Sequence, residues 1–433
     1  MKKIYLLLTL VMAFTIPAGI SAATPLPARF SGTMMPYDFS RVADKAVWPD
    51  SLRPVYVAHV ARHGARYMSS DKKLEKLRNA IAESRAKGSL TPAGENFERL
   101  LDSVASLSDG KWGALSEVGR REEVGIARNL YSLMPSLFRH ARLNAISSYV
   151  PRVVMTMYEF CHELSWLSHD VTTVTAEGKE FDPLVRCFEV DSLYDDFRQH
   201  DLWRNGHEDY LDSMAPAAPA MRLFGKNSGF SDKKLRTLTM EIYDILQSLA
   251  AFGMPPADDE FMTEKEYESC WRLDNTEHYL RNADTPWSDL AGKASSPLLA
   301  KIITDADASL GAMLLGQTLK REGMHSAAIA PEPYLANLYF GHAETLMPLL
   351  SLMQVEGCHY ESSDLSSLAD RWVDSDIVPL GAHLDVILLA SPSGKVMAAL
   401  MLNGRFLHPM GGSDYVVSWE AYRDWLLSRI RAV

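Results

Sequence analysis

The sequence predicts an α/β protein with a mostly parallel central sheet flanked by helices and an inserted, mostly helical second domain. Apolar runs typical of buried strands occur near both ends of the chain, for example VYVAHV from residue 55 and ANLYF from residue 336. Helical periodicity follows these runs at both ends, which favours strand–helix–strand units and hence parallel strands. The middle of the chain differs, since it is rich in Trp, Asp and Glu and is interrupted by Pro and Gly.

The individual elements follow from local periodicity and composition. Residues 72–84, 95–107 and 116–134 alternate charged and apolar side chains with helical spacing, and Ser116 is a suitable N-cap. The stretch ARLNAISSYVPR predicts a second strand that enters a loop at Pro151 and Arg152. Further strands are predicted for LDVILLASP and KVMAALMLNG, which a Ser-Gly turn joins.

Two packed units are expected for a chain of this length. We assign residues 24–172 and 325–433 to the α/β domain. Residues 173–324 form the predicted helical insertion, with helices in KKLRTLTMEIYDILQSLAAF and SSPLLAKIITDADASLGAMLLGQTLKR.

The first 23 residues have the three parts of a secretory signal peptide. Lys2 and Lys3 precede an apolar run over residues 4–16, and Ser21 and Ala23 suit the small-residue positions before a cleavage site. The run is too short to span a bilayer as a helix. We therefore expect export from a bacterial cell, to the periplasm or beyond, and no membrane span.

Charge and cysteine content limit the partners and cofactors. The formal net charge is −11, which disfavours nonspecific binding to nucleic acid. The four cysteines lie far apart with no zinc-ligand spacing, and their pairing is open. We expect a monomer that needs no cofactor and no metal, and in which any small polyanionic substrate would require a local cluster of positive charge.

Basic residues gather where predicted strands end. Arg62, His63 and Arg66 follow the first strand, and Arg152 follows the second. The segment GHAE, residues 341–344, follows ANLYF and opens a helix. Ligands of open α/β sheets bind beyond the carboxyl ends of strands, and arginines together with a helix N-terminus suit a phosphate.

The residue types also predict a reaction. A neutral imidazole of His63 is able to attack phosphorus, while arginines spread the charge of the transferred phosphoryl group. Glu344 is the predicted acid for the leaving oxygen and later the base for water. Arg62, Arg66, Arg152 and His342 are the predicted phosphate ligands.

These segments resemble the histidine acid phosphatases, the larger branch of the histidine phosphatase superfamily. RHGARYM resembles the signature RHGxRxP of that family, with Met68 in place of the proline. GHAE resembles its second motif, GALSEVGRREEVGIA its G-x-L-T-x-x-G stretch, and SSYVPRVVMT the segment that supplies the third arginine. The HAE form points to the multiple inositol polyphosphate phosphatase subgroup.

The resemblance implies a phytase-like activity, in which phosphates are removed stepwise from inositol hexakisphosphate through a phosphohistidine. It also implies that Arg186, in LVRCFEVD, and Lys72 contact substrate, although Lys72 suits a solvated helix start equally well. One alternative is a phosphatase of the same fold that acts on sugar phosphates or nucleotides. Another is a noncatalytic phosphate-binding protein, which would need no proton donor such as Glu344.

Overall fold

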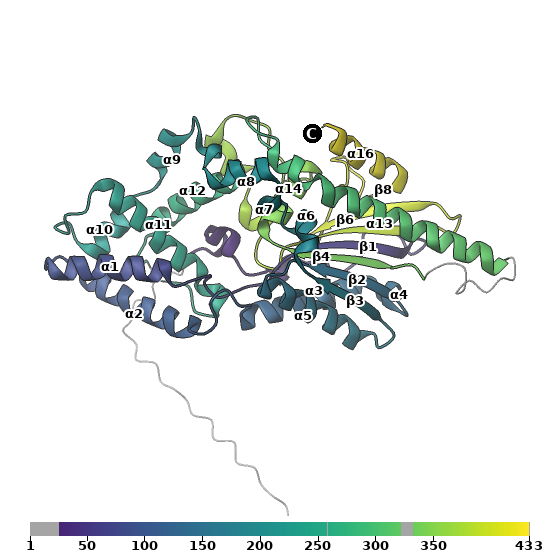
Figure 1. Ribbon diagram of the computed structural model, residues 1–433, viewed down its shortest axis with the longest axis horizontal. Coiled ribbons are helices and arrows are strands. Elements are labelled where there is room, and N and C mark those ends of the chain that lie inside the picture. The colour runs from purple at the N-terminus through teal and green to yellow at the C-terminus, as the bar shows by residue number, and fades with distance from the viewer. Residues whose placement is uncertain (1–25, 258, 322–331, 433) are drawn as a thin grey trace, which may run out of the picture.

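The computed structural model describes residues 26–257, 259–321 and 332–432. An eight-stranded sheet forms one half of the described molecule, and a group of helices lies beside it (Figure 1). The predicted signal peptide lies outside the described residues, so export stays a prediction.

The sheet has the order β3-β2-β4-β1-β5-β6-β7, with β8 paired to β6. Its strands are β1 (Arg53–Arg62), β2 (Arg142–Ser147), β3 (Thr172–Glu177), β4 (Ala336–Gly341), β5 (His383–Ala390), β6 (Val396–Leu402), β7 (Arg405–Leu407) and β8 (Val416–Ser418). β1, β2, β3 and β4 pair in parallel, whereas β5 to β8 join through antiparallel pairs. The predicted mixed α/β fold with parallel strands at its centre is confirmed.

Some α-helices cover the two faces of this sheet, and the others form the group beside it. They are α1 (Lys72–Ala86), α2 (Pro92–Ser108), α3 (Glu117–Leu133), α4 (Pro135–Phe138), α5 (Pro151–Leu167), α6 (Asp182–Val185), α7 (Cys187–Val190), α8 (Ser192–Gln199), α9 (Glu208–Met214), α10 (Ala218–Phe224), α11 (Asp232–Ser248), α12 (Glu264–Asn282), α13 (Leu290–Arg321), α14 (Ala343–Leu352), α15 (Asp374–Ile377) and α16 (Trp419–Ala432). In Figure 1, α3, α4 and α5 lie below the sheet, and α13 and α16 lie above it.

Local chemistry explains the elements that position the site. The inner part of β1 is fully buried, as its β-branched, aromatic and small side chains favour. Ser116 caps α3 by accepting a hydrogen bond from the Gly119 amide, as predicted. Pro151 occupies the first turn of α5, where its missing N–H is no loss.

The packing does not follow the predicted domain boundaries at every point. β3 begins at Thr172 and forms the edge of the sheet, although the insertion was predicted to start at residue 173. α1 and α2, from the first predicted unit, pack against α10 and α11 of the second. α13 packs on β1, α14 and α16. The division into two domains therefore stays a prediction.

Two further observations concern membranes and cysteines. None of the described helices is both long and apolar enough to cross a membrane. The four cysteines, all within the described residues, are buried free thiols. None of the disulfide pairings that the sequence left open is therefore formed between these four cysteines.

Candidate active site

Strand register brings the predicted motifs together. Arg62 at the end of β1 pairs with Gly341 at the end of β4, so His63 and His342 leave neighbouring parallel strands at the same edge. Ser147 of β2 lies opposite Phe340, which places the loop before α5 beside them. Residues far apart in the chain therefore meet beyond the carboxyl ends of three strands, as ligand sites of open α/β sheets do.

A cavity of about 490 Å³ opens at this edge. Seven of the eight predicted site residues line it: Arg62, His63, Arg66, Arg152, Arg186, His342 and Glu344. Lys72 is the exception, because it is exposed in the first turn of α1 and does not line this cavity. Its exposed position fits the solvated helix start, and its role as a substrate contact stays a prediction.

His63 is buried and lines the cavity. Its Nδ1 lies 2.9 Å from the carbonyl oxygen of Gly64, a geometry that keeps the proton on Nδ1 and leaves the Nε2 lone pair free. Its ring centre is 5.6 Å from that of His342. Burial first, and then the charges of Arg152 and Arg62, hold the pKa of His63 well below its usual range. The imidazole is therefore neutral.

Three arginines surround His63. The Nη1 of Arg62 donates to the carbonyl oxygens of Thr33 and Val378, both at 2.6 Å, which fixes the plane of the guanidinium group. Burial lowers the pKa of Arg62, Arg66 and Arg152 to about 10, so all three stay charged at neutral pH. Together they offer a preorganised set of cationic donors.

The arginines of the cavity have unused donors. Six arginines line it, and the buried Nε of each has no hydrogen-bond acceptor among the described residues: Arg62, Arg66, Arg152, Arg186, Arg198 and Arg281. Only two carboxylates, Glu189 and Glu344, share the cavity with them. A buried, unpaired N–H is costly, so this arrangement fits a ligand with many anionic oxygens.

His342 and Glu344 lie at the start of α14. The Nε2 of His342 is 3.2 Å from both Ser148 Oγ and Arg186 Nη1, so the ring accepts a hydrogen bond from the arginine. Burial, which outweighs the attraction of Glu344, lowers the pKa of His342 to about 3. For Glu344, burial raises the pKa, but Arg198 at 3.5 Å and His342 outweigh it and hold the pKa at about 2. Without ligand, His342 is neutral and Glu344 is ionised.

A second layer holds the loop that bears His63. The buried carboxylate of Glu122 on α3 accepts hydrogen bonds from the amides of Ala65, at 2.6 Å, and Tyr37, at 2.9 Å. Met68, which stands at the proline position of the signature RHGxRxP, is buried, and its carbonyl accepts a hydrogen bond of 2.6 Å from the Gly113 amide. Backbone hydrogen bonds thus replace the rigidity that a proline would give.

Sequence reasoning missed three cationic side chains of the cavity. Arg198 on α8, and His278 and Arg281 on α12, line it although each lies far along the chain from the motifs. α8 is short and α12 is strongly polar, so the sequence predicts that their charged side chains face solvent. Only the tertiary packing of α8 and α12 around α14 reveals their role, and a single sequence holds no signal for it.

Known proteins resemble this chain in sequence and in fold. No protein-family profile matches the chain. Over 442 residues, the chain is 24% identical to human multiple inositol polyphosphate phosphatase 1, covering 93% of this chain and 84% of the human protein.

Two solved structures share the fold. Multiple inositol polyphosphate phosphatase of Bifidobacterium longum, in complex with inositol hexasulfate, superposes with a TM-score of 0.74 at 15% identity, covering 90% of this chain and 96% of that chain. The phytase of D. castellii superposes with a TM-score of 0.61 at 14% identity, covering 93% and 85%. The resemblance to the histidine acid phosphatases that the motifs predicted is confirmed.

Proposed function

We propose that the chain is a phosphomonoesterase that hydrolyses inositol polyphosphates, phytate among them, through a phosphohistidine on His63. The observation that supports this most is the neutral His63 beside six arginines whose Nε donors lack acceptors among the described residues. The relative with 24% identity and the two structures of similar fold are inositol polyphosphate phosphatases or phytases by name.

In the first step, the Nε2 lone pair of His63 attacks phosphorus and forms the N–P bond. The bond between phosphorus and the inositol oxygen breaks, and that oxygen takes a proton from Glu344. Arg62, Arg66 and Arg152 stabilise the charge on the three equatorial oxygens of the phosphoryl group. In the second step, water attacks phosphorus and gives a proton to Glu344, while the N–P bond breaks and releases phosphate.

The number of cations favours a substrate with several phosphates. A single phosphate would occupy only part of the donors that six arginines offer, and the others would stay buried and unpaired. An inositol polyphosphate places further phosphates around a ring of suitable size. The arrangement therefore fits this substrate class better than sugar phosphates or nucleotides, and the acid at Glu344 distinguishes it from a mere binding protein.

Glu344 carries no proton in the free protein, so it must gain one when substrate binds. Its pKa of about 2 leaves Glu344 ionised in the free protein at any ordinary pH. A bound polyanion neutralises Arg198 and the other arginines and so raises that pKa. Substrate phosphates that arrive partly protonated also supply the proton directly, so we expect the activity to be greatest under acidic conditions.

The test is phosphate release from inositol hexakisphosphate by the wild type and by His63→Ala, with p-nitrophenyl phosphate as a second substrate. We expect the wild type to hydrolyse the inositol phosphate and the variant to lose both activities while keeping its circular dichroism spectrum. Full activity of a folded His63→Ala would exclude His63 as nucleophile. An inactive wild type would leave binding without catalysis as the function.

A further inference from the structure

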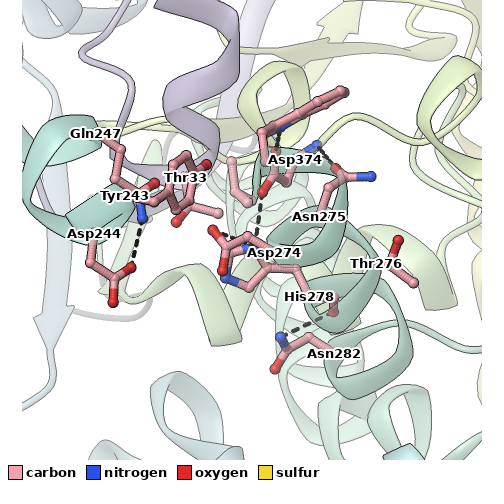
Figure 2. A network of polar contacts seen from close by, with 12 residues as sticks. Thr33, Tyr243, Asp244, Gln247, Asp274, Asn275, Thr276, His278, Asn282 and Asp374 are labelled. Atoms are coloured by element: carbon pink, nitrogen blue, oxygen red, sulfur yellow. Dashed lines mark hydrogen bonds and ion pairs between the residues drawn. The ribbon is translucent and has the colours of Figure 1, made fainter. Parts of the chain in front are cut away.

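A network of polar groups surrounds His278, which lines the cavity (Figure 2). At its centre, His278 of α12 lies between Asp374 of α15 and Asp274 of its own helix. Its Nδ1 is 2.8 Å from Asp374 Oδ2 and 3.9 Å from Asp274 Oδ2. Two carboxylates thus face the same ring nitrogen.

Hydrogen bonds hold Asp374 in place, and its buried carboxylate lies beside a group that can supply the counter-charge. It is wholly buried, its Oδ1 accepts a hydrogen bond of 3.0 Å from Trp271 Nε1, and its amide donates to Asn275 Oδ1 at 2.8 Å. A buried carboxylate is stable in its ionised form only with such donors and a counter-charge. The protonated ring of His278 is the counter-charge within hydrogen-bond distance.

The charges around His278 agree with a protonated ring. Burial lowers the pKa of His278, but Asp274, Asp374 and Glu344 raise it to about 9. Arg66 and Arg281 line the cavity of His63 together with His278, and Arg66 and Lys73 line a neighbouring hollow that His278 also borders. Burial raises the pKa of Asp274 to about 7 even though His278 opposes the change.

His278 also lies where two hollows meet. It lines the cavity of His63 and a neighbouring hollow of about 300 Å³, and both share Thr33, Met34 and Arg66 as well. While Nδ1 contacts Asp374, Nε2 has no hydrogen-bond partner among the described residues, and the side chain is 24% exposed. The free N–H of an imidazolium therefore faces the space in which the distal part of a substrate would lie.

We propose that His278, held between Asp274 and Asp374, binds a phosphate group of the substrate other than the one that is transferred. This inference rests on the proposed function, because it names a specificity residue of the same cleft. His278 would act with Arg66, which lines both hollows, and it would select substrates that have a second phosphate. It takes no part in the chemical steps.

The first experiment compares two substrates in His278→Gln. Loss of one charge-assisted hydrogen bond should raise KM for inositol hexakisphosphate about tenfold relative to KM for p-nitrophenyl phosphate, with little change in the kcat ratio. His359→Gln is the matched control, because His359 is 22% exposed, contacts Glu361 and lies outside both hollows. It should change neither substrate's kinetics. An equal change on both substrates in His278→Gln would overturn the proposal.

A second experiment measures binding without hydrolysis and so separates this proposal from the proposed function. Inositol hexasulfate is titrated calorimetrically into the wild type and His278→Gln, and Kd should rise about tenfold in the variant. An inactive wild type that still shows this difference would refute the hydrolase but keep the subsite. An active wild type with equal Kd values would refute the subsite and keep the hydrolase.

Two measurements on the wild type remain informative if His278→Gln does not fold. Nitrogen NMR should find both ring nitrogens of His278 protonated at pH 7, and the Nε2 signal should move when inositol hexasulfate is added. A neutral ring, or an unmoved signal, would overturn the proposal. Asp274, His278 and Asp374 also lie close enough to hold a metal ion. Binding that falls with a chelator and returns with zinc would show a metal site in place of the imidazolium.

Discussion

In the proposed mechanism, His63 must be neutral and Glu344 must be protonated. In the free protein, the surroundings of the two residues favour only the first of these states. The neutral form of His63 is the nucleophilic form, and burial among arginines favours it. The same arginines hold Glu344 ionised, whereas a proton donor must be protonated. In the proposed mechanism, substrate binding therefore prepares Glu344, since a polyanion removes the electrostatic cause of the low pKa of Glu344.

The role of Glu344 gives a first prediction. Glu344→Gln should depress the hydrolysis of inositol hexakisphosphate by about a hundredfold or more, because its alkoxide leaving group needs a proton. Hydrolysis of p-nitrophenyl phosphate should fall much less, since its phenolate leaves without one. The ratio of the two single-turnover rates for the first step is the measurement. Equal losses on both substrates would mean that Glu344 is not the leaving-group acid.

Arg198 gives a second prediction through pH. Arg198 is the largest opposing charge on Glu344, with the Nη2 to Oε1 distance at 3.5 Å. Arg198→Gln removes a positive charge and so raises the pKa of Glu344, which keeps the proton to higher pH. The alkaline limb of the kcat profile should therefore move to higher pH. A limb that stays in place, or moves to lower pH, would contradict this assignment.

At the scale of elements, α3 and the loop that bears His63 approach each other very closely. A Cβ on Gly119 would lie 2.2 Å from the carbonyl oxygen of Ala65, and one on Gly64 would lie 2.9 Å from that of Gly119. The two glycines let the helix start meet the loop, where Glu122 accepts the Ala65 amide. The helix therefore positions the loop through its backbone.

A third prediction tests that contact. Gly119→Ala should destabilise the protein by about 1–3 kcal/mol, as overpacking against backbone does, and should lower kcat because the loop moves. Gly311→Ala in α13 is the matched control, because a Cβ there meets nothing within 4 Å and alanine favours a helix. Urea unfolding should give a lower free energy of unfolding for Gly119→Ala than for Gly311→Ala, and kcat should be lower in Gly119→Ala as well. Similar behaviour of the two would show that the close approach is unimportant.

Elements with a strong local pattern could be predicted from the sequence. β1 and β4 are continuous apolar runs, and His63 and His342 of the motifs at their ends line one cavity. β3, with the sequence TTVTAE, is polar and half exposed, so no pattern separated it from a loop. Arg198 and Arg281 reach the cavity only through packing between helices distant in sequence, which local patterns do not encode.

At the scale of the molecule, an acidic chain encloses a basic cavity. The formal net charge is −11, yet six arginines and two glutamates line the site. Charges confined to a cleft with low-dielectric walls attract an anionic substrate in spite of the overall charge. In the proposed mechanism, this local charge takes the place of a divalent cation at the transferred phosphoryl group.

This charge distribution leads to a fourth prediction. A strong chelator should leave the hydrolysis of p-nitrophenyl phosphate unchanged, because arginines stabilise the transferred group without a metal. Added salt should raise KM for inositol hexakisphosphate more than KM for p-nitrophenyl phosphate, because more charge pairs are screened. Activity that is lost with a chelator and restored by a divalent cation would contradict the metal-free mechanism.

The central claim is that His63 becomes phosphorylated during turnover. The most direct test mixes enzyme with radiolabelled substrate, stops the reaction in alkali, where phosphohistidine survives, and locates the label by mass spectrometry. The account predicts one labelled residue, His63, with its label chased away by unlabelled substrate, and no label in His63→Ala. A label on another residue, or an active wild type that never becomes labelled within the first turnover, would contradict it.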